Sequence, residues 1–293
     1  AVGLDKKFLD NYGYNIYDHL EKIFFETRKS YKKVRRDFWK LISRTLEKSY
    51  FKQIGEWCQS KGINFTGHLY GEETLSMQIG LEGELFGMLR YMQMPGVDRL
   101  YCTDPRDHIP EKTASSVAHL FGRDSVMSES SNHFEKAYWN KDVDVTDIIN
   151  SATYQFTLGV NTIASYYNFE LIPYSDRKLF QEYMGRLNYM FSDTEHIAPV
   201  LIHIPMVGAW ERYQTPGEKY WHVGPGPVAE GQVKPVRELE ESYGALLSRL
   251  MDSQWDFDLI DDRGLVEECN VNASNKITTK FEEFKTLVIF DTG

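Results

Sequence analysis

The feature of the sequence that most constrains its fold is a unit that occurs four times between residues 62 and 168. In each copy a glycine or proline ends a helical pattern, a short apolar segment follows, and polar side chains come next. The copies are GINFTGHLYGEE (62–73), PGVDRLYCTDP (95–105), GRDSVMSESSN (122–132) and GVNTIASYYN (159–168). Helices that alternate with such strands are typical of (β/α) barrels, whose active sites lie at the carboxyl ends of the strands. The repeat therefore predicts an α/β enzyme.

The sequence divides into two regions. Residues 1–194 carry the repeated units, and apolar residues at helical spacing predict amphipathic helices over 37–60 and 74–92. Residues 195–293 contain the apolar segment HIAPVLIHIPM (196–206), a long stretch rich in glycine and proline, another helical pattern and further short strands. We therefore predict a first α/β domain over 1–194 and a second, smaller α/β unit over 195–293.

Charge and composition argue against several partners. The formal net charge is −10, whereas a surface that binds nucleic acid needs a basic face. No apolar run approaches the roughly 20 residues of a membrane-spanning helix. Cys58, Cys102 and Cys269 are widely spaced and form no CxxC pair, so neither a disulfide framework nor a zinc site is predicted. We expect no nucleic acid and no membrane as partner, and the sequence indicates no particular compartment.

Glu129 is the strongest candidate for a catalytic residue. It lies where the strand of the third unit is expected to end, between the small residues Ser128 and Ser130, which would leave room for a ligand. A glycosidase needs one carboxylate that faces the anomeric carbon and a second that protonates the leaving oxygen. Asn132 and His133 follow and could bind sugar hydroxyls. A structural salt bridge or a helix cap would explain this glutamate equally well.

The first unit ends in His68, Glu72 and Glu73. We expect His68 and Glu72 to face the mouth of the barrel, and Glu73 to open the next helix, where a carboxylate is favourable. Capping of that helix would explain both glutamates as well. One histidine and one glutamate lack the i, i+4 histidine pair of a zinc helix, so no metal site is predicted here.

The other units add candidate substrate-binding residues. Tyr101 and Asp104 end the expected strand of the second unit, Asn161 and Tyr166 belong to the fourth, and Trp139 lies in the loop after the third. Aromatic rings can stack on a sugar ring, and tyrosine also offers a hydroxyl group. A tight turn at TDP and ordinary core packing are the competing explanations.

Several motifs in sequence order carry a resemblance to a known group of enzymes. They are FTGHLYGEE, YMQMPGVDRLY, SSVAHLFGRDSVMSES, YQFTLGVN and YMGRLNYMF, followed by HIAPVLIHIP. With these motifs the chain resembles bacterial glycoside hydrolases, namely the family 106 α-L-rhamnosidases and their relatives, and more loosely the family 42 β-galactosidases.

The resemblance implies a fold and a division of the catalytic groups. Residues 1–194 would form the second half of a (β/α)8 TIM-type barrel with Glu129 on its seventh strand, and residues 195–293 part of a flavodoxin-like α/β domain. The chain would then be a fragment, with the first four strands and the proton donor upstream of Ala1. The resemblance also implies calcium, although no oxygen-rich calcium-binding loop is apparent; otherwise no cofactor is expected.

The leading hypothesis is a glycoside hydrolase fragment that cleaves an α-L-rhamnoside or β-galactoside, in an oligosaccharide, polysaccharide or other glycoside, with Glu129 as nucleophile or base. One alternative is a non-catalytic carbohydrate-binding or scaffold module. Another is a metal-dependent hydrolase of a (β/α) fold that uses His68 and Glu72. The open edges of half a barrel would favour pairing with other chains, and hence an oligomer. Retaining or inverting chemistry is not indicated, because it depends on the separation of the two carboxylates.

Overall fold

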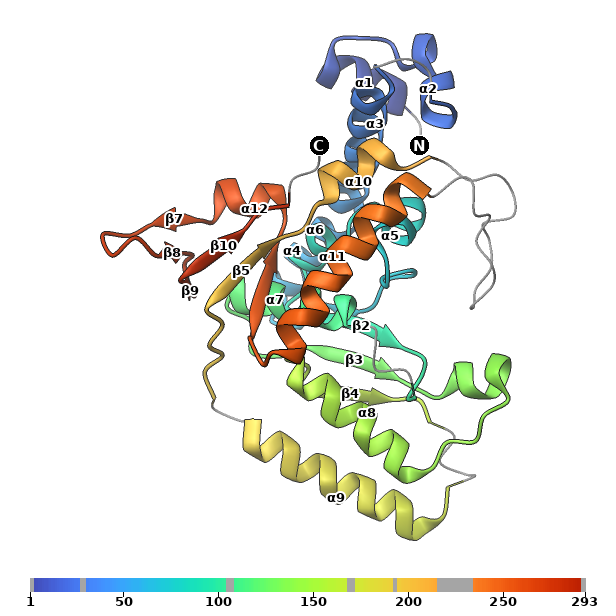
Figure 1. Ribbon diagram of the computed structural model, residues 1–293, viewed down its shortest axis with the longest axis vertical. Helices are drawn as coiled ribbons and strands as arrows, with labels where there is room; N and C mark the ends of the chain where they lie inside the picture. The colour runs from blue at the N-terminus through green and yellow to red at the C-terminus, as the bar shows by residue number, and fades with distance from the viewer. Residues whose placement is uncertain are drawn as a thin grey trace.

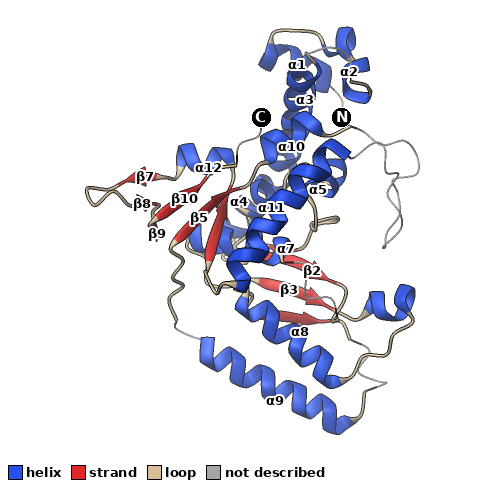
Figure 2. Cartoon of the chain, viewed as in Figure 1, coloured by secondary structure: helices blue, strands red, loops and turns tan. Residues whose placement is uncertain are grey.

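The computed structural model of the chain has a mixed α/β architecture (Figures 1 and 2). It describes residues 3–26, 30–103, 108–167, 172–191, 194–214 and 234–290. The described strands form a four-stranded parallel sheet of order β1-β2-β3-β4, a three-stranded parallel sheet of order β10-β5-β6, and a small antiparallel sheet of order β7-β8-β9. The predicted α/β class with parallel strands is confirmed.

The strands are short and alternate with helices over most of the chain. The strands are β1 (Thr66–Gly67), β2 (Met94–Arg99), β3 (Met127–Ser130), β4 (Thr162–Ser165), β5 (Val200–His203), β6 (Phe257–Ile260), β7 (Asn270–Val271), β8 (Ile277–Thr278), β9 (Glu283–Phe284) and β10 (Thr286–Val288). The helices are α1 (Leu4–Tyr12), α2 (Glu21–Phe24), α3 (Tyr31–Leu46), α4 (Lys52–Ser60), α5 (Leu75–Leu81), α6 (Leu85–Leu89), α7 (Ile109–Leu120), α8 (Val145–Thr157), α9 (Tyr174–Phe191), α10 (Met206–Arg212), α11 (Lys234–Asp252) and α12 (Asp262–Glu267). A 3-10 turn, η1 (Ile16–His19), and two π-helical turns, η2 (Glu47–Phe51) and η3 (Glu135–Trp139), complete the described elements. None of the described helices is both long enough and apolar enough to cross a bilayer.

Helices α7 and α8 cover one face of the four-stranded sheet. Arg99, the last residue of β2, pairs with Glu111 of α7 at 2.9 Å, and both side chains are buried. Ser130, the last residue of β3, donates its hydroxyl to Gln155 of α8 at 3.1 Å. Because side chains alternate between the two faces along a strand, the residues before Arg99 and Ser130 lie on the opposite face.

That opposite face carries the polar residues of interest. The register pairs Asp98 with Glu129, and Glu129 with Ala164. On the same face of β2, a Cβ atom at Gly96 would lie 2.4 Å from the carbonyl oxygen of Gly67 and 2.8 Å from the side chain of Met127. Only glycine therefore allows β1 and β3 to lie this close to β2 at that point.

Two of the predicted helices differ from the helices in the structure. The helix predicted over 37–60 begins at Tyr31, and α3, η2 and α4 follow one another without a gap to Ser60. The helix predicted over 74–92 is two short helices, α5 and α6, because the chain turns at Gly83 with a φ of +102°. A Cβ there would lie 2.7 Å from the Cβ of Ser43, so the turn packs directly on α3.

Helix α7 lies between the two parallel sheets and contacts both β2 and β6 (Figure 1). Val97 of β2, Val117 of α7 and Leu259 of β6 belong to one continuous apolar core. The backbone amide of Leu259 also donates to the hydroxyl of Ser116 on α7, at 2.8 Å. The boundary predicted at residue 194 separates the strands of the two sheets in sequence, but the sheets share one core.

Candidate functional site

Three ionisable side chains meet at the carboxyl ends of neighbouring strands in the four-stranded sheet. His68 directly follows β1, Asp98 is the second-last residue of β2, and Glu129 is the second-last residue of β3. The His68 Nε2 atom lies 3.2 Å from the Glu129 Oε2 atom, and its Nδ1 atom lies 3.8 Å from Asp98 Oδ2. All three side chains are partly exposed, so this group is accessible to a ligand.

Asp98 has the most perturbed acid–base behaviour in this group. The pKa of the Asp98 carboxyl is raised to about 6, mainly by burial and also by the nearby Glu129 carboxylate, whereas His68 and His133 act in the opposite direction. An ordinary aspartic acid has a pKa of about 3.9. Asp98 therefore keeps its proton in mildly acidic solution, and perturbed pKa values of this kind are frequent at functional sites.

The sequence-based prediction missed Asp98. The strand of the second unit was expected to extend to Asp104, whereas β2 ends at Arg99. Alternation within VDR would have indicated Asp98, because Val97 and Arg99 are buried on the helix-covered face and the residue between them must face the other way. Asp104 lies outside the described residues.

A carboxyl titration of Asp98 by NMR is expected to show a midpoint near pH 6 rather than near its ordinary value of about 3.9. Glu129→Gln removes a negative neighbour and should lower this midpoint, whereas His68→Ala removes a partner of the charged form and should raise it. Between the two pKa values the folded chain binds more protons than the unfolded chain, so the contribution of Asp98 to stability falls as the pH rises from about 4 to about 6. A midpoint at the ordinary value in the unchanged chain would contradict this expectation.

Glu72 was predicted to face the mouth of the barrel, but in the structure it is buried and supports the group of His68, Asp98 and Glu129. Its side chain is almost fully buried, with 2% of the residue exposed. One carboxylate oxygen accepts the backbone amide of Leu69 at 2.7 Å, and the other accepts the amide of Asp98 at 2.8 Å. Burial raises the pKa of Glu72 well above its usual range, although these two hydrogen bonds lower it. Glu72 thus holds the segment after His68 in place beside Asp98.

The predicted aromatic and amide residues near Glu129 differ in their exposure. Tyr101 is buried, and its ring stacks on Phe134 with a centroid separation of 5.7 Å. Trp139 packs against the same two rings but remains 37% exposed. Tyr166 follows β4 and is 69% exposed, and Asn132 is half-buried after β3. Trp139 and Tyr166 are therefore the aromatic residues of this set that a sugar could reach.

Asn161 lies at the wrong end of β4 for the predicted role. Its side-chain oxygen, Oδ1, accepts a hydrogen bond from the backbone amide of Val126 at 2.9 Å. Its side-chain nitrogen, Nδ2, donates to the backbone carbonyl of Asp124 at 2.8 Å. Both contacts lie before the strands begin, at the amino-terminal end of the sheet, whereas His68 and Glu129 lie at the carboxyl end. Asn161 therefore aligns β3 with β4 and is not part of the group around Glu129.

The serines beside Glu129 also have a different role from the one expected. Ser128 and Ser130 are fully buried on the helix-covered face, and their hydroxyl groups hydrogen-bond to each other at 3.1 Å. They point away from Glu129 and therefore do not line a ligand site beside it. Their burial fixes which way β3 faces, and so directs Glu129 to the open face.

No protein-family model matches the sequence, and no curated protein matches it. Among solved structures, the fold is similar to that of a rhamnosidase from Novosphingobium sp. PP1Y, with a TM-score of 0.61 and 14% sequence identity over 99% of this chain. The chain spans 27% of the length of that rhamnosidase. At this level of identity the similarity concerns the fold alone, and the fold is like that of part of a glycoside hydrolase.

Proposed function

We propose that the chain is part of a glycoside hydrolase, and that the four-stranded sheet is half of a (β/α)8 barrel. The observation that carries this proposal is the group of His68, Asp98 and Glu129 at the carboxyl ends of three adjacent parallel strands. This is the end at which barrel enzymes hold their catalytic residues. The sequential strand order and the fold similarity to a rhamnosidase support the same function.

The chemistry follows from two carboxyl groups with different protonation. Cleavage of a glycosidic bond needs a carboxylate that attacks the anomeric carbon or activates water, and a carboxylic acid that protonates the leaving oxygen. Glu129 takes the first role, and His68, at 3.2 Å, orients its carboxylate. Asp98 is a candidate for the second role, because its pKa of about 6 lets it hold a proton in mildly acidic solution. The resemblance had implied a proton donor upstream of Ala1.

The substrate proposed is an α-L-rhamnoside or a β-galactoside. Trp139 and Tyr166 provide exposed rings in the segments that follow β3 and β4, suited to contact with a sugar ring. Residues 195–293, with a parallel sheet of order β10-β5-β6, are proposed to be part of a flavodoxin-like domain.

Calcium fits the group of His68, Asp98 and Glu129 poorly, since two carboxylates and one imidazole fall short of the six to eight oxygen ligands that calcium takes.

The proposal is tested with the protein that contains these 293 residues, using 4-nitrophenyl α-L-rhamnopyranoside and 4-nitrophenyl β-D-galactopyranoside. Release of nitrophenol from one of them is expected, with a rate that rises as the pH falls from about 7 towards 6, since Asp98 must be protonated. Sugar binding is measured in parallel by saturation-transfer NMR with L-rhamnose and D-galactose. Binding without turnover would favour a carbohydrate-binding module. The absence of both binding and turnover would contradict the proposal.

A further inference from the structure

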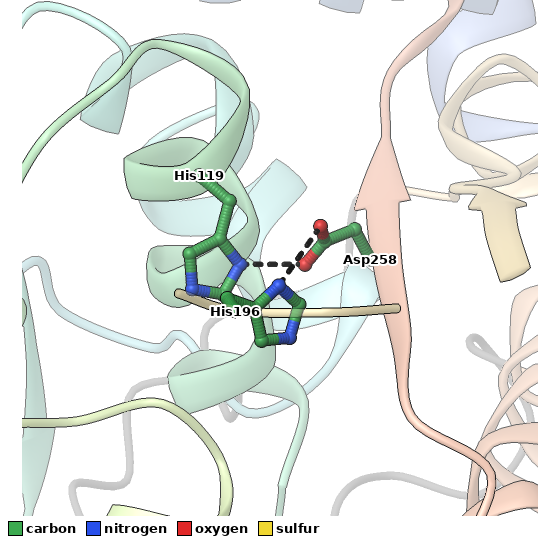
Figure 3. A group of neighbouring side chains, drawn as sticks. All are labelled: His119, His196 and Asp258. Atoms are coloured by element: carbon green, nitrogen blue, oxygen red, sulfur yellow. Dashed lines mark hydrogen bonds and ion pairs between the residues drawn. The ribbon is translucent and has the colours of Figure 1, made fainter. Parts of the chain in front are cut away.

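A second group of ionisable side chains lies at the other end of the four-stranded sheet, where α7 meets the second sheet. It consists of His119 in the last turn of α7, His196 in the segment between α9 and β5, and Asp258 in β6. One nitrogen of each histidine and one carboxylate oxygen lie within 4.8 Å of one another. Both imidazole rings direct their Nδ1 atoms at the Asp258 carboxylate (Figure 3). No sequence motif relates these three residues, since they are far apart in the chain.

Two atoms of this group are buried without a hydrogen-bond partner in the described part of the chain. They are Nδ1 of His196 and Oδ2 of Asp258. The Asp258 residue is fully buried. Buried polar atoms are nearly always hydrogen-bonded, and an isolated buried carboxylate oxygen is costly. These two atoms face each other at 3.7 Å, which is too long for a hydrogen bond between them.

His196 also has a carboxylate at its other ring nitrogen. Its Nε2 atom lies 3.0 Å from the Asp256 carboxylate. A cation between His196 Nδ1 and Asp258 Oδ2 would give a partner to both of these atoms. A histidine that donates its second nitrogen to a carboxylate is also the usual arrangement around protein-bound zinc.

The distance between His196 Nδ1 and Asp258 Oδ2 fits a bridging metal ion better than a bridging water molecule. A water bonded to both at about 2.8 Å, with a near-tetrahedral angle, would hold them about 4.6 Å apart. A zinc ion bonded to both at about 2.1 Å would hold them about 3.4 Å apart at the tetrahedral angle, and farther apart at a wider angle. The observed 3.7 Å is close to the second arrangement.

The ring of His119 stacks on that of His196, with centroids 3.6 Å apart and 14° between the planes, so the rings would have to tilt to direct a nitrogen each at one ion. Nδ1 of His119 lies 2.9 Å from the other oxygen of Asp258, so a metal would displace the proton that these two atoms share. Lys112 pairs with Asp256 at 2.8 Å and offsets its charge, whereas the Asp258 carboxylate lies against the two histidines. The group borders an open cleft whose wall also includes Glu282, and solvent can therefore supply the ion.

We propose that His119, His196 and Asp258 bind a divalent transition metal ion such as Zn²⁺, with Asp256 orienting His196 and a water or Glu282 completing the coordination. Two imidazoles and a carboxylate are ligands that zinc accepts in proteins. The ion would join three separate segments of the chain, namely α7, the segment before β5, and β6. It would thereby fasten the second sheet to the helix that both sheets share, at the opposite end of the four-stranded sheet from Glu129.

The test is metal binding by the chain without an affinity tag. Competition between the chain and a chromophoric chelator for Zn²⁺ is expected to give one site per chain, and Co²⁺ is expected to give visible absorption bands of a four- or five-coordinate site. Zn²⁺ should also raise the Tm, and EDTA should reverse this rise. The variants His119→Gln and His196→Gln should each weaken Zn²⁺ binding at least tenfold, and Asp256→Asn by about tenfold to a hundredfold.

His203→Gln is the matched control. His203 lies on β5 of the same sheet, its Nε2 pairs with Asp262 at 3.1 Å, and its Nδ1 is also buried without a hydrogen-bond partner among the described residues. It is not part of the three-residue group, so this variant should bind Zn²⁺ as the unchanged chain does. The absence of a Zn²⁺ site in the folded unchanged chain would overturn the proposal, as would unaltered affinity in both His119→Gln and His196→Gln.

Discussion

Glu129→Gln is expected to lower the rate of glycoside hydrolysis by about 10²–10⁴-fold, the range typical for loss of a catalytic acid or base. Glutamine keeps the shape of the side chain but cannot act as a nucleophile or base. The fold should be retained, because Glu129 is partly exposed and pairs with His68, which is about equally accessible. Sugar affinity, measured by titration, should therefore change little while kcat falls.

Two further variants make this result specific. Glu238→Gln alters an exposed carboxylate on α11, far in sequence from the group and on a different element, and should leave kcat unchanged. His68→Ala should lower kcat less than Glu129→Gln does, since His68 orients the carboxylate and does not itself attack. Turnover by Glu129→Gln at the rate of the unchanged protein would show that the reaction does not depend on this residue.

Glu47→Ala is expected to reduce the free energy of unfolding by about 3–5 kcal/mol, the usual loss when one partner of a buried ion pair is removed. Glu47 is fully buried at the start of the π-helical turn η2. Its carboxylate accepts hydrogen bonds from Arg44 and Arg263, both at 2.7 Å, and from the hydroxyl of Tyr91 at 2.9 Å. Burial alone would raise the pKa of Glu47, but the hydrogen bonds from Arg263 and Arg44 outweigh it and hold the pKa below its usual range.

Denaturation by guanidinium chloride measures this loss. The variant leaves two arginines without their shared carboxylate, and Arg263 belongs to α12 of the second sheet region, so both halves of the chain are destabilised together. Lys178→Ala provides the comparison, because it breaks an exposed pair with Glu182 on α9 and should change the unfolding free energy little. A similar small change for Glu47→Ala would mean that the buried network contributes no more than a surface pair.

The repeated unit in the sequence predicted the four-stranded sheet well, because glycine, apolar residues and polar residues in that order constrain the chain locally. The strands β1, β3 and β4 fall within their copies, and β2 begins one residue before its copy, at Met94. Asp104 was preferred over Asp98 because the strand was expected to continue beyond Arg99, where β2 ends, and the alternation of Val97, Asp98 and Arg99 was overlooked. The local pattern also could not predict that Glu72 is buried, since its position depends on hydrogen bonds to Leu69 and to Asp98 on a different strand.

Long-range contacts account for the remaining differences. The break between α5 and α6 at Gly83 reflects the close approach of Ser43, forty residues earlier in the chain. His119, His196 and Asp258 come from three elements, and no spacing in the sequence relates them. Asn161 was taken as a substrate-binding residue of the fourth unit, whereas it lies just before β4, which begins at Thr162.

The position of α7 between the two parallel sheets has a practical consequence for dividing the protein. A truncation after residue 194 would remove β6 and leave the opposite face of α7 open to water. That face carries Lys112, whose ion-pair partner Asp256 would be lost, and Ser116, whose hydroxyl accepts from Leu259. Expression boundaries chosen from the sequence alone would therefore cut through a shared core, and the second sheet region belongs in any fragment meant to keep α7 folded.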